Sequence, residues 1–307
     1  YIPALIPKNE ELATYLEHSL VLSQETAKEA FTSCIGHSIR ESMYPIIEDI
    51  KVFLTYPQTM RSIMICGPHK SGKHHLLRCI MQYLKIDTEQ LLHIDCAAIA
   101  LGKLTISDIM QRIDTSLDQE KSNIILFENL DALTELPASI TTMETLLRFY
   151  QRMAESNELN LLFLAVTAMN EHFLQLQKLF QKVYELPDLN SRTLKEKYEF
   201  VLHFMQNEAD AIGKTISLSS SILNCFATAC YPGNLQNLKQ ELRHALSYAY
   251  IQSSQQQETF ITIDYQHLSD ELLASIRNVS DILPIIESIT STLQEKNHFL
   301  IPETECI

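Results

Sequence analysis

The chain has 307 residues, of which 46% are hydrophobic and 20% charged, a composition that excludes wholesale disorder and allows a sizeable core. Its length predicts one large domain with an accessory part, or two domains. The formal net charge of −14 makes nucleic acid a poor partner, because a phosphate backbone attracts a broad basic surface.

Cysteine usage and hydropathy indicate the compartment. The seven cysteines are scattered without a C-x-x-C pair, which favours reduced thiols and an intracellular, cytoplasmic protein. No apolar run reaches the ~18–20 residues that cross a bilayer, so we expect no membrane span.

The first predicted elements alternate between helices and short apolar strands. Residues 1–22 form an N-terminal extension, and apolar residues at helical spacing predict a helix over about 23–54. Helical patterns separate the apolar runs that follow, so we expect a parallel sheet covered on both faces, an α/β architecture. The predicted strands cover residues 62–66, 91–95, 123–127, 159–166 and 182–186.

Strand signals largely stop after Pro187, and helical patterns replace them. The predicted helices are 194–212, 219–229 and 235–250, followed by a polar linker at 253–258, a small strand or extended link at 259–263 and a helix to about 277. We therefore divide the chain into the extension, an α/β part (23–188), a helical lid (189–278) and an amphipathic tail (279–307). The apolar residues of the tail either pack on the chain's own core or dock a partner.

Two of only six glycines lie in the sequence Gly67-Pro-His-Lys-Ser-Gly-Lys73, which fits the phosphate-loop pattern G-x-x-x-x-G-K between a strand and a helix. Glycines let backbone N–H groups surround phosphate, and the lysine reaches the terminal phosphates of ATP or ADP. The alternative is a strand-to-helix turn that binds nothing. The nucleotide-binding candidates are Gly67, Pro68, His69, Lys70, Ser71, Gly72, Lys73, His74 and His75.

The residue after the lysine departs from the pattern. A serine or threonine hydroxyl normally ligates Mg²⁺ there, but this chain has His74. Mg²⁺ prefers oxygen ligands, so the Mg²⁺ site is compromised. A metal site formed by His69, His74 and His75 is disfavoured, because no cysteine or carboxylate stands at ligand spacing.

The segment Ile124-Ile-Leu-Phe-Glu-Asn-Leu-Asp-Ala-Leu133 resembles the second signature of the AAA+ ATPases. This resemblance implies a P-loop AAA+ fold, a three-layer parallel sheet with a C-terminal helical lid subdomain. It puts Glu128 at the position of the Mg²⁺-associated aspartate, where it would hold Mg²⁺ through water. Asn129 takes the position of the water-activating glutamate, and an amide cannot act as a general base.

Further AAA+ landmarks are mixed. The segment after the fourth strand resembles sensor 1, with Thr167 or Asn170 as the polar residue. Leu179 stands where the family carries an arginine finger. Tyr231-Pro-Gly-Asn-Leu-Gln236 resembles the turn before the last lid helix of bacterial enhancer-binding AAA+ proteins, which have an arginine where this chain has Gln236. Four catalytic groups are thus replaced, which favours a pseudo-ATPase.

Residues 60–73 are similar to the IQ-and-AAA proteins of the ciliary nexin–dynein regulatory complex, and residues 93–96 and 124–136 resemble the degenerate first ATPase domain of peroxisomal AAA proteins. The first resemblance implies a nucleotide-binding scaffold with protein partners in a multi-subunit assembly, in the axoneme of a cilium or flagellum. The alternative is a weak or partner-completed ATPase that remodels a protein complex. A transcription activator is less favoured, because the chain lacks the Gly-Ala-Phe-Thr-Gly-Ala loop of enhancer-binding proteins.

Overall fold

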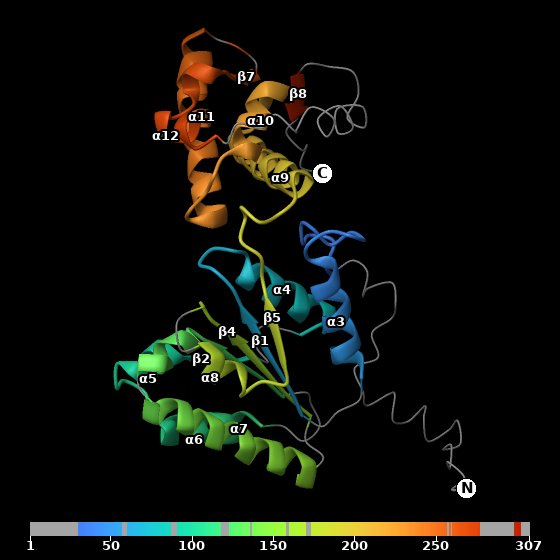
Figure 1. Cartoon of the computed structure of the whole chain (residues 1–307), viewed down its shortest axis with the longest axis vertical. Helices are drawn as coiled ribbons and strands as arrows, with labels where there is room; N and C mark the ends of the chain where they lie inside the picture. Colours follow the sequence, from blue (N-terminus) through green and yellow to red (C-terminus); the bar gives the residue numbers. More distant parts are fainter. Residues whose placement is uncertain are drawn as a thin grey trace, which may run out of the picture. The chain divides into compact units, whose positions relative to one another are not determined.

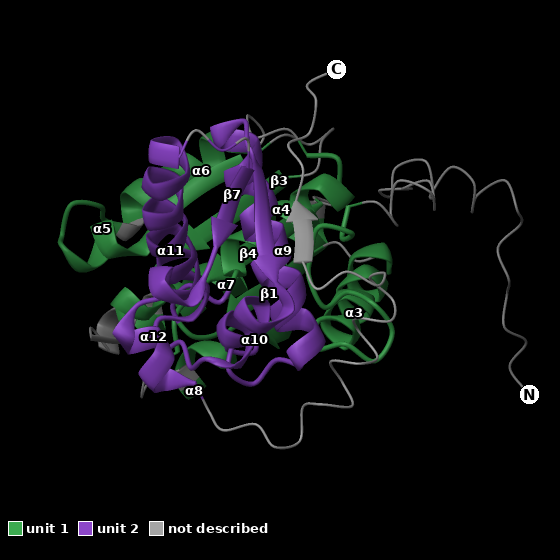
Figure 2. Ribbon diagram, turned by 90° about the horizontal axis from the view of Figure 1, so that it is seen from above, with its two compact units in different colours: residues 1–68, 72–186 green, residues 69–71, 187–307 purple. Residues whose placement is uncertain are grey.

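The computed structural model describes residues 30–56, 60–86, 91–117, 123–135, 137–157, 160–169, 173–256, 258, 260–276 and 298–301. The chain divides into two compact units, coloured separately in Figure 2: residues 1–68 with 72–186, and residues 187–307 with the short stretch 69–71. The predicted extension 1–22 and most of the predicted tail 279–307 lie outside the described residues. The division into four functional parts therefore stays a prediction.

The first unit is built on a five-stranded sheet. Its strands are β1 (Met60–Cys66), β2 (Leu91–Asp95), β3 (Asn123–Glu128), β4 (Leu161–Val166) and β5 (Lys182–Glu185). They lie in the order β2-β3-β4-β1-β5, and all neighbouring pairs are parallel. The predicted α/β architecture with a parallel sheet is thus confirmed. Because the strands are parallel, the segments that follow β1, β2, β3 and β4 meet at one edge of the sheet.

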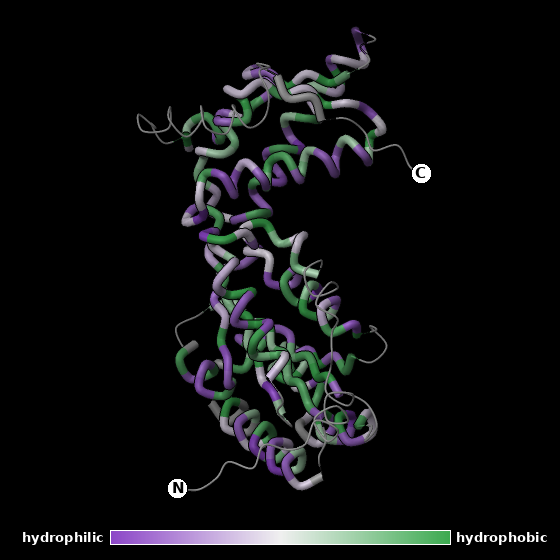
Figure 3. Tube along the Cα trace, turned by 90° about the vertical axis from the view of Figure 1, so that its right-hand side faces the viewer, coloured by the Kyte–Doolittle hydropathy of each residue, from purple (hydrophilic) through white to green (hydrophobic). Residues whose placement is uncertain are grey.

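Helices cover both faces of this sheet (Figure 1). They are α3 (Tyr44–Thr55), α4 (Lys73–Tyr83), α6 (Ile106–Ser116) and α7 (Pro137–Asn157). Successive strand residues point to opposite faces, so Ile63 and Ile65 pack with α3 and α4, whereas Met64 packs with α6 and α7. Figure 3 shows the helices changing between hydrophobic and hydrophilic along their length, as amphipathic helices do.

Short helices complete the first unit: α5 (Cys96–Ala100), η2 (Leu130–Glu135) and α8 (Phe173–Gln177). The predicted helix over 23–54 is wrong for residues 30–43, which form turns, and residues 23–29 lie outside the described part. Gly36 and Arg40 have positive φ angles of 90° and 74°, a conformation that a right-handed helix excludes. Pro45 then lies in the first turn of α3, where a missing N–H is tolerated.

The second unit, as far as the structure describes it, contains four α-helices, one short 3-10 helix and a small sheet. The helices are α9 (Leu194–Ile212), α10 (Ser220–Thr228), α11 (Asn234–Gln256), η3 (Tyr265–His267) and α12 (Asp270–Ser275). Thr193 and Glu196 form a capping box at the start of α9, and Gly213, with φ 67°, ends it. The helices predicted over 194–212, 219–229 and 235–250 are thereby confirmed.

Two features of the second unit differ from the expectation. The strands β6 (Thr215–Ser219), β7 (Phe260–Ile263) and β8 (His298–Ile301) form a sheet of order β7-β6-β8. β7 confirms the small strand expected over 259–263, whereas the sequence does not predict β6 or β8. Helix α11 also continues to Gln256 through the predicted linker, because glutamine is a good helix former and Ser253 is 2% exposed. Among the described residues, no helix is both long and apolar enough to cross a membrane.

Candidate functional site

The loop between β1 and α4 requires glycine at both ends. Gly67 has φ 141° and Gly72 has φ 102°, values that residues with a side chain rarely adopt. A Cβ atom on Gly67 would lie 2.8 Å from the carbonyl oxygen of Leu186, so the backbone leaves no room for a side chain. The two glycines of the predicted phosphate loop are therefore required by the conformation of the loop.

The loop holds the ammonium group of its lysine against its own backbone. Lys73 is 7% exposed, and its Nζ donates to the carbonyl oxygens of Gly67 at 2.9 Å and Pro68 at 2.6 Å. An anionic acceptor in the loop would give this ammonium a partner of opposite charge. Together with the conformation of the two glycines, Lys73 fits a phosphate group.

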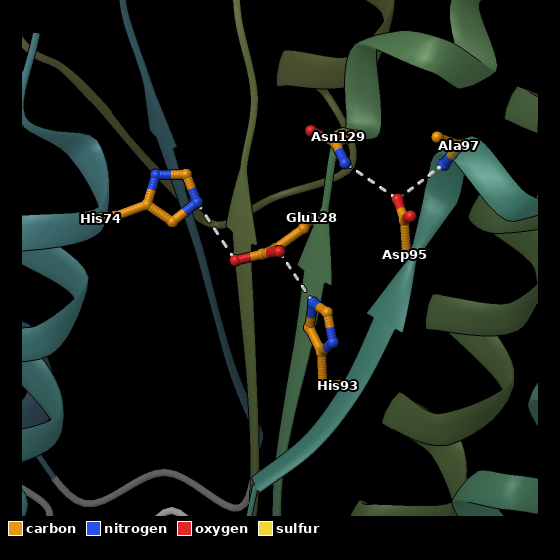
Figure 4. A network of polar contacts seen from close by, with 6 residues as sticks. All are labelled: His74, His93, Asp95, Ala97, Glu128 and Asn129. Atoms are coloured by element: carbon orange, nitrogen blue, oxygen red, sulfur yellow. Dashed lines mark hydrogen bonds and ion pairs between the residues drawn. The ribbon is translucent and has the colours of Figure 1, made fainter. Parts of the chain in front are cut away.

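Glu128 is held by two histidines at the carboxyl end of β3 (Figure 4). His74 Nε2 lies 3.1 Å from Glu128 Oε1, and His93 Nε2 lies 2.8 Å from Oε2. The Glu128 side chain is 24% exposed, so this arrangement is open to solvent. Both carboxylate oxygens thus contact imidazoles, and Mg²⁺ would have to displace them. The groups present fit Mg²⁺ poorly, since a histidine also replaces the hydroxyl ligand.

Asn129 faces away from Glu128 toward the neighbouring strand end (Figure 4). Its Nδ2 donates to Asp95 Oδ1 at 2.9 Å, and the same oxygen accepts the backbone N–H of Ala97 as the N-cap of α5. Asn129 has φ 53°, a left-handed conformation that asparagine tolerates better than most residues. Asn129, which the sequence comparison predicts at the general-base position, is therefore a hydrogen-bond donor to Asp95.

Thr167 lies at the carboxyl end of β4 and is 1% exposed. Its Oγ1 lies 3.2 Å from Asp131 Oδ1 and 3.0 Å from the carbonyl oxygen of Ala168, and the Ala168 N–H donates to the same aspartate oxygen. The predicted sensor threonine is thus buried and hydrogen-bonded to the partly buried Asp131. The other sensor candidate, Asn170, lies outside the described residues.

Lys178 and Lys182, which flank the predicted arginine-finger position Leu179, differ in environment. Lys182 donates to both carboxylate oxygens of Asp49, at 3.1 and 2.8 Å, and the hydroxyl of Tyr184 donates to the same carboxylate. The hydrogen bond from Lys182 holds the pKa of Asp49 below its usual value, and Tyr184 lowers it further. Lys182 is thereby engaged in linking β5 to α3, whereas Lys178 is exposed.

The three loop histidines do not gather at one point. His74 contacts Glu128, whereas His75 Nε2 lies 3.0 Å from the carbonyl oxygen of Ser33 and 3.9 Å from Cys79 Sγ. The expectation that no cysteine stands at ligand spacing is wrong, because Cys79 follows His75 by four residues on α4. Among the described residues, one group of three can share an ion: Cys34, His75 and Cys79. The H-x-x-x-C spacing was the signal for this group, although Cys34 is distant in sequence.

No known protein-family model matches the chain. The chain is 22% identical over 301 residues to the transcriptional regulatory protein LevR of Bacillus subtilis, a match that covers 84% of this chain. It spans about a third (32%) of the length of that relative.

Solved structures share the fold. NtrX from Brucella abortus superposes with a TM-score of 0.51 at 17% identity, covering 94% of this chain and 67% of NtrX, and its complex with ATP gives 0.53 at 16%, covering 94% and 66%. A variant of RuvB from Thermotoga maritima gives 0.51 at 12%, covering 76% of this chain and 68% of RuvB. These neighbours are AAA+ P-loop ATPases, so the chain has the AAA+ P-loop fold.

Proposed function

We propose that this chain is a nucleotide-binding AAA+ domain that binds ATP or ADP through residues 67–73 and hydrolyses ATP very slowly or not at all. The observation that carries the proposal is the contrast between two neighbouring parts of the site. The phosphate loop retains its glycines and its buried lysine, whereas Glu128 is bridged by His74 and His93.

Nucleotide binding is supported by the interior of the loop. The Lys73 ammonium is a donor suited to phosphate oxygens, and the amino end of α4 adds partial positive charge. NtrX, which shares the fold, has been crystallised in complex with ATP and with ADP. The phosphates of a bound nucleotide would supply the negative charge that pairs with the Lys73 ammonium.

Weak hydrolysis follows from Glu128 and Asn129. Mg²⁺ would have to separate Glu128 from two imidazoles, and no hydroxyl stands at residue 74 to replace them. Asn129 cannot take a proton from water, and loss of a general base typically costs about 10²–10⁴-fold in rate. The phosphate loop is thus better suited to bind phosphate than Glu128 and Asn129 are to activate water.

The role that remains for such a domain is a scaffold in a protein assembly, where nucleotide stabilises one conformation. The −14 net charge favours protein partners over nucleic acid. The similar proteins named above are bacterial and lend no support to an axonemal location, so the proposal names no organelle.

Nucleotide affinity and turnover test the proposal together. We expect purified protein to bind fluorescent ATP and ADP with similar affinity with or without Mg²⁺. We expect turnover at least ~100-fold below the ~1 s⁻¹ found at the slow end of ordinary enzymes. Turnover near that rate would overturn the inactive assignment, and failure to bind either nucleotide would overturn the assignment of the loop.

A matched pair of variants tests the loop lysine. Lys73→Ala removes the buried ammonium and should weaken ATP binding about 10- to 100-fold, the worth of one charge-assisted hydrogen bond or slightly more. Arg78→Ala removes an exposed cation from the same helix and should leave the affinity unchanged. Equal affinities for the wild type and Lys73→Ala would show that phosphate binds elsewhere.

The second candidate is an ATPase that a partner completes, as part of a transcription-regulatory protein. The match to LevR over 84% of this chain favours the regulatory setting, and the Asp95 carboxylate beside Asn129 keeps an acid at this edge of the sheet. A partner would then supply the missing arginine. ATP turnover that rises at least ~100-fold on adding a protein partner would favour this candidate over the scaffold.

A further inference from the structure

A cluster of sulfur and nitrogen atoms lies between the first turns of α4 and the turns that precede α3. Cys34 Sγ donates to Cys79 Sγ at 3.2 Å, and Cys79 Sγ lies 3.9 Å from His75 Nε2. The three possible ligand atoms lie within 4.8 Å of one another. Cys34 precedes α3, whereas His75 and Cys79 are one turn apart on α4. The cluster therefore joins two segments that are distant in sequence.

We propose that Cys34, His75 and Cys79 form a binding site for a soft divalent cation of the Zn²⁺ type. Two thiolates and one imidazole are a ligand set that Zn²⁺ uses in proteins, with water in the fourth position where the site is open. Both cysteines are buried and His75 is exposed, so His75 supplies the side that solvent reaches. The site is separate from Glu128 and does not depend on nucleotide binding.

The geometry needs only a small adjustment to hold the ion. Tetrahedral Zn–S bonds of ~2.3 Å place two sulfur atoms about 3.8 Å apart, so the sulfurs of Cys34 and Cys79 must separate by about half an ångström. His75 must also change one hydrogen bond. Its Nε2 contacts the carbonyl oxygen of Ser33, and ligation requires the tautomer with the proton on Nδ1.

The environment of Cys79 differs from that of other buried cysteines. The hydrogen bond from Cys34, and after it those with His75 and Ser33, lower the pKa of the Cys79 thiol to about 4, although burial raises it. Burial instead raises the pKa of Cys66 to about 12. The assignment stands on the positions of the three ligand atoms, and cysteine binds metal as the thiolate. Binding of the ion releases the remaining thiol protons to solvent, and no oxidant is needed.

A disulfide between Cys34 and Cys79 is the competing chemistry. No disulfide joins the six cysteines that the structure describes. A disulfide would use both sulfurs and leave His75 without a role, and its formation would require an oxidant. The imidazole of His75 beside the two sulfur atoms favours a bound metal ion over a disulfide.

Cobalt titration tests the proposal on the reduced, chelator-treated protein. We expect one equivalent of Co²⁺ to give a thiolate-to-cobalt charge-transfer band and the visible bands of a tetrahedral site, and Zn²⁺ to abolish both. Cys34→Ser, Cys79→Ser and His75→Gln should each weaken Co²⁺ binding at least ~10-fold. Circular dichroism of each variant establishes that it is folded.

Two controls make the result specific. His74→Gln changes the adjacent histidine, which contacts Glu128, and Cys230→Ser changes a cysteine in the other unit. Both should bind Co²⁺ as the wild type does. Absence of the charge-transfer band in the wild type, an unchanged band in folded Cys34→Ser, or a Cys34–Cys79 disulfide with no Co²⁺ binding in the reduced protein would each overturn the proposal.

Discussion

The side-chain amide of Asn129 donates a hydrogen bond to the carboxylate of Asp95 across the ends of two adjacent parallel strands. In the register of the sheet Asp95 lies opposite Glu128. Asn129 is the first residue after β3, and its side chain points toward the end of β2. Asn129 therefore helps to hold the ends of β2 and β3 together, and we expect its replacement to change the stability of the protein.

The first prediction concerns this pair. Asn129→Glu should lower the free energy of unfolding by about 1–2 kcal/mol from left-handed strain alone, and by a further ~0.5 kcal/mol or more from repulsion by Asp95. Asn129→Gln has nearly the same shape without the charge, so it isolates the strain. Adding Asp95→Asn should recover the charge part for the glutamate variant and not for the glutamine variant. Urea unfolding measures all four, and strictly additive values would contradict the repulsion.

The second prediction concerns Mg²⁺. His74→Thr supplies the hydroxyl that the phosphate-loop pattern normally carries and removes one imidazole from Glu128. We expect Mg²⁺ to tighten ATP binding about 10-fold in this variant, an effect of ~1.4 kcal/mol, and by much less in the wild type. His74→Ala removes the same imidazole without adding a hydroxyl and should show no such gain. If both variants respond to Mg²⁺ alike, the hydroxyl is not the missing group.

The third prediction compares two glycines. Gly67→Ala combines a positive φ with a Cβ atom 2.8 Å from a backbone oxygen, whereas Gly102→Ala, with φ 68°, meets nothing within 4 Å. Gly102→Ala should cost about 1 kcal/mol of stability from backbone strain. Gly67→Ala should cost more, and it should also weaken ATP binding. Thermal unfolding with and without ATP measures both effects, and equal losses would mean that the loop shifts to accept the methyl group.

The fourth prediction concerns acid. The hydrogen bond from Lys182 holds the pKa of Asp49 below 3.8 in the folded state. The ionised Asp49 therefore contributes fully to stability at pH values above its pKa in the unfolded chain. This contribution is lost as the pH falls through its lower pKa in the folded protein. Asp49→Asn should therefore destabilise the protein at neutral pH, and its difference from the wild type should shrink below pH 3.8.

A neighbouring carboxylate serves as the control for the fourth prediction. Glu48→Gln removes an acid from the same helix whose ion pair with Lys51 is local, and such exposed pairs contribute little. Its effect on urea unfolding should be smaller than that of Asp49→Asn at neutral pH. A pH-independent difference between the wild type and Asp49→Asn would contradict the assignment of the shifted carboxyl.

The strands β1, β3 and β4 of the first unit could be predicted because each is a buried, mainly apolar run that ends at a polar residue or a glycine. β1 stops at Gly67, and β3 stops at Glu128. The helix expected over 30–43 failed because apolar spacing gives no information on φ, and Gly36 and Arg40 adopt left-handed values. β6 could not be predicted with the same certainty, because its alternation of polar and apolar residues covers only five positions.

The partners of the site residues were harder to predict than the residues themselves. His74 and Asn129 are visible as departures from a pattern, but their contacts with Glu128 and Asp95 depend on how the strand and helix ends meet. The contact between Cys34 and Cys79 spans 45 residues, and the turns before α3 that place Cys34 leave no periodic signal.

The ammonium of Lys73, which donates to Gly67 and Pro68 within its own loop, has a kinetic consequence. Under the proposed function, a phosphate that took the place of those two carbonyl oxygens would bind only after the lysine had released them. The observed association rate would then level off at high nucleotide concentration instead of rising in proportion, and Lys73 would set its limit.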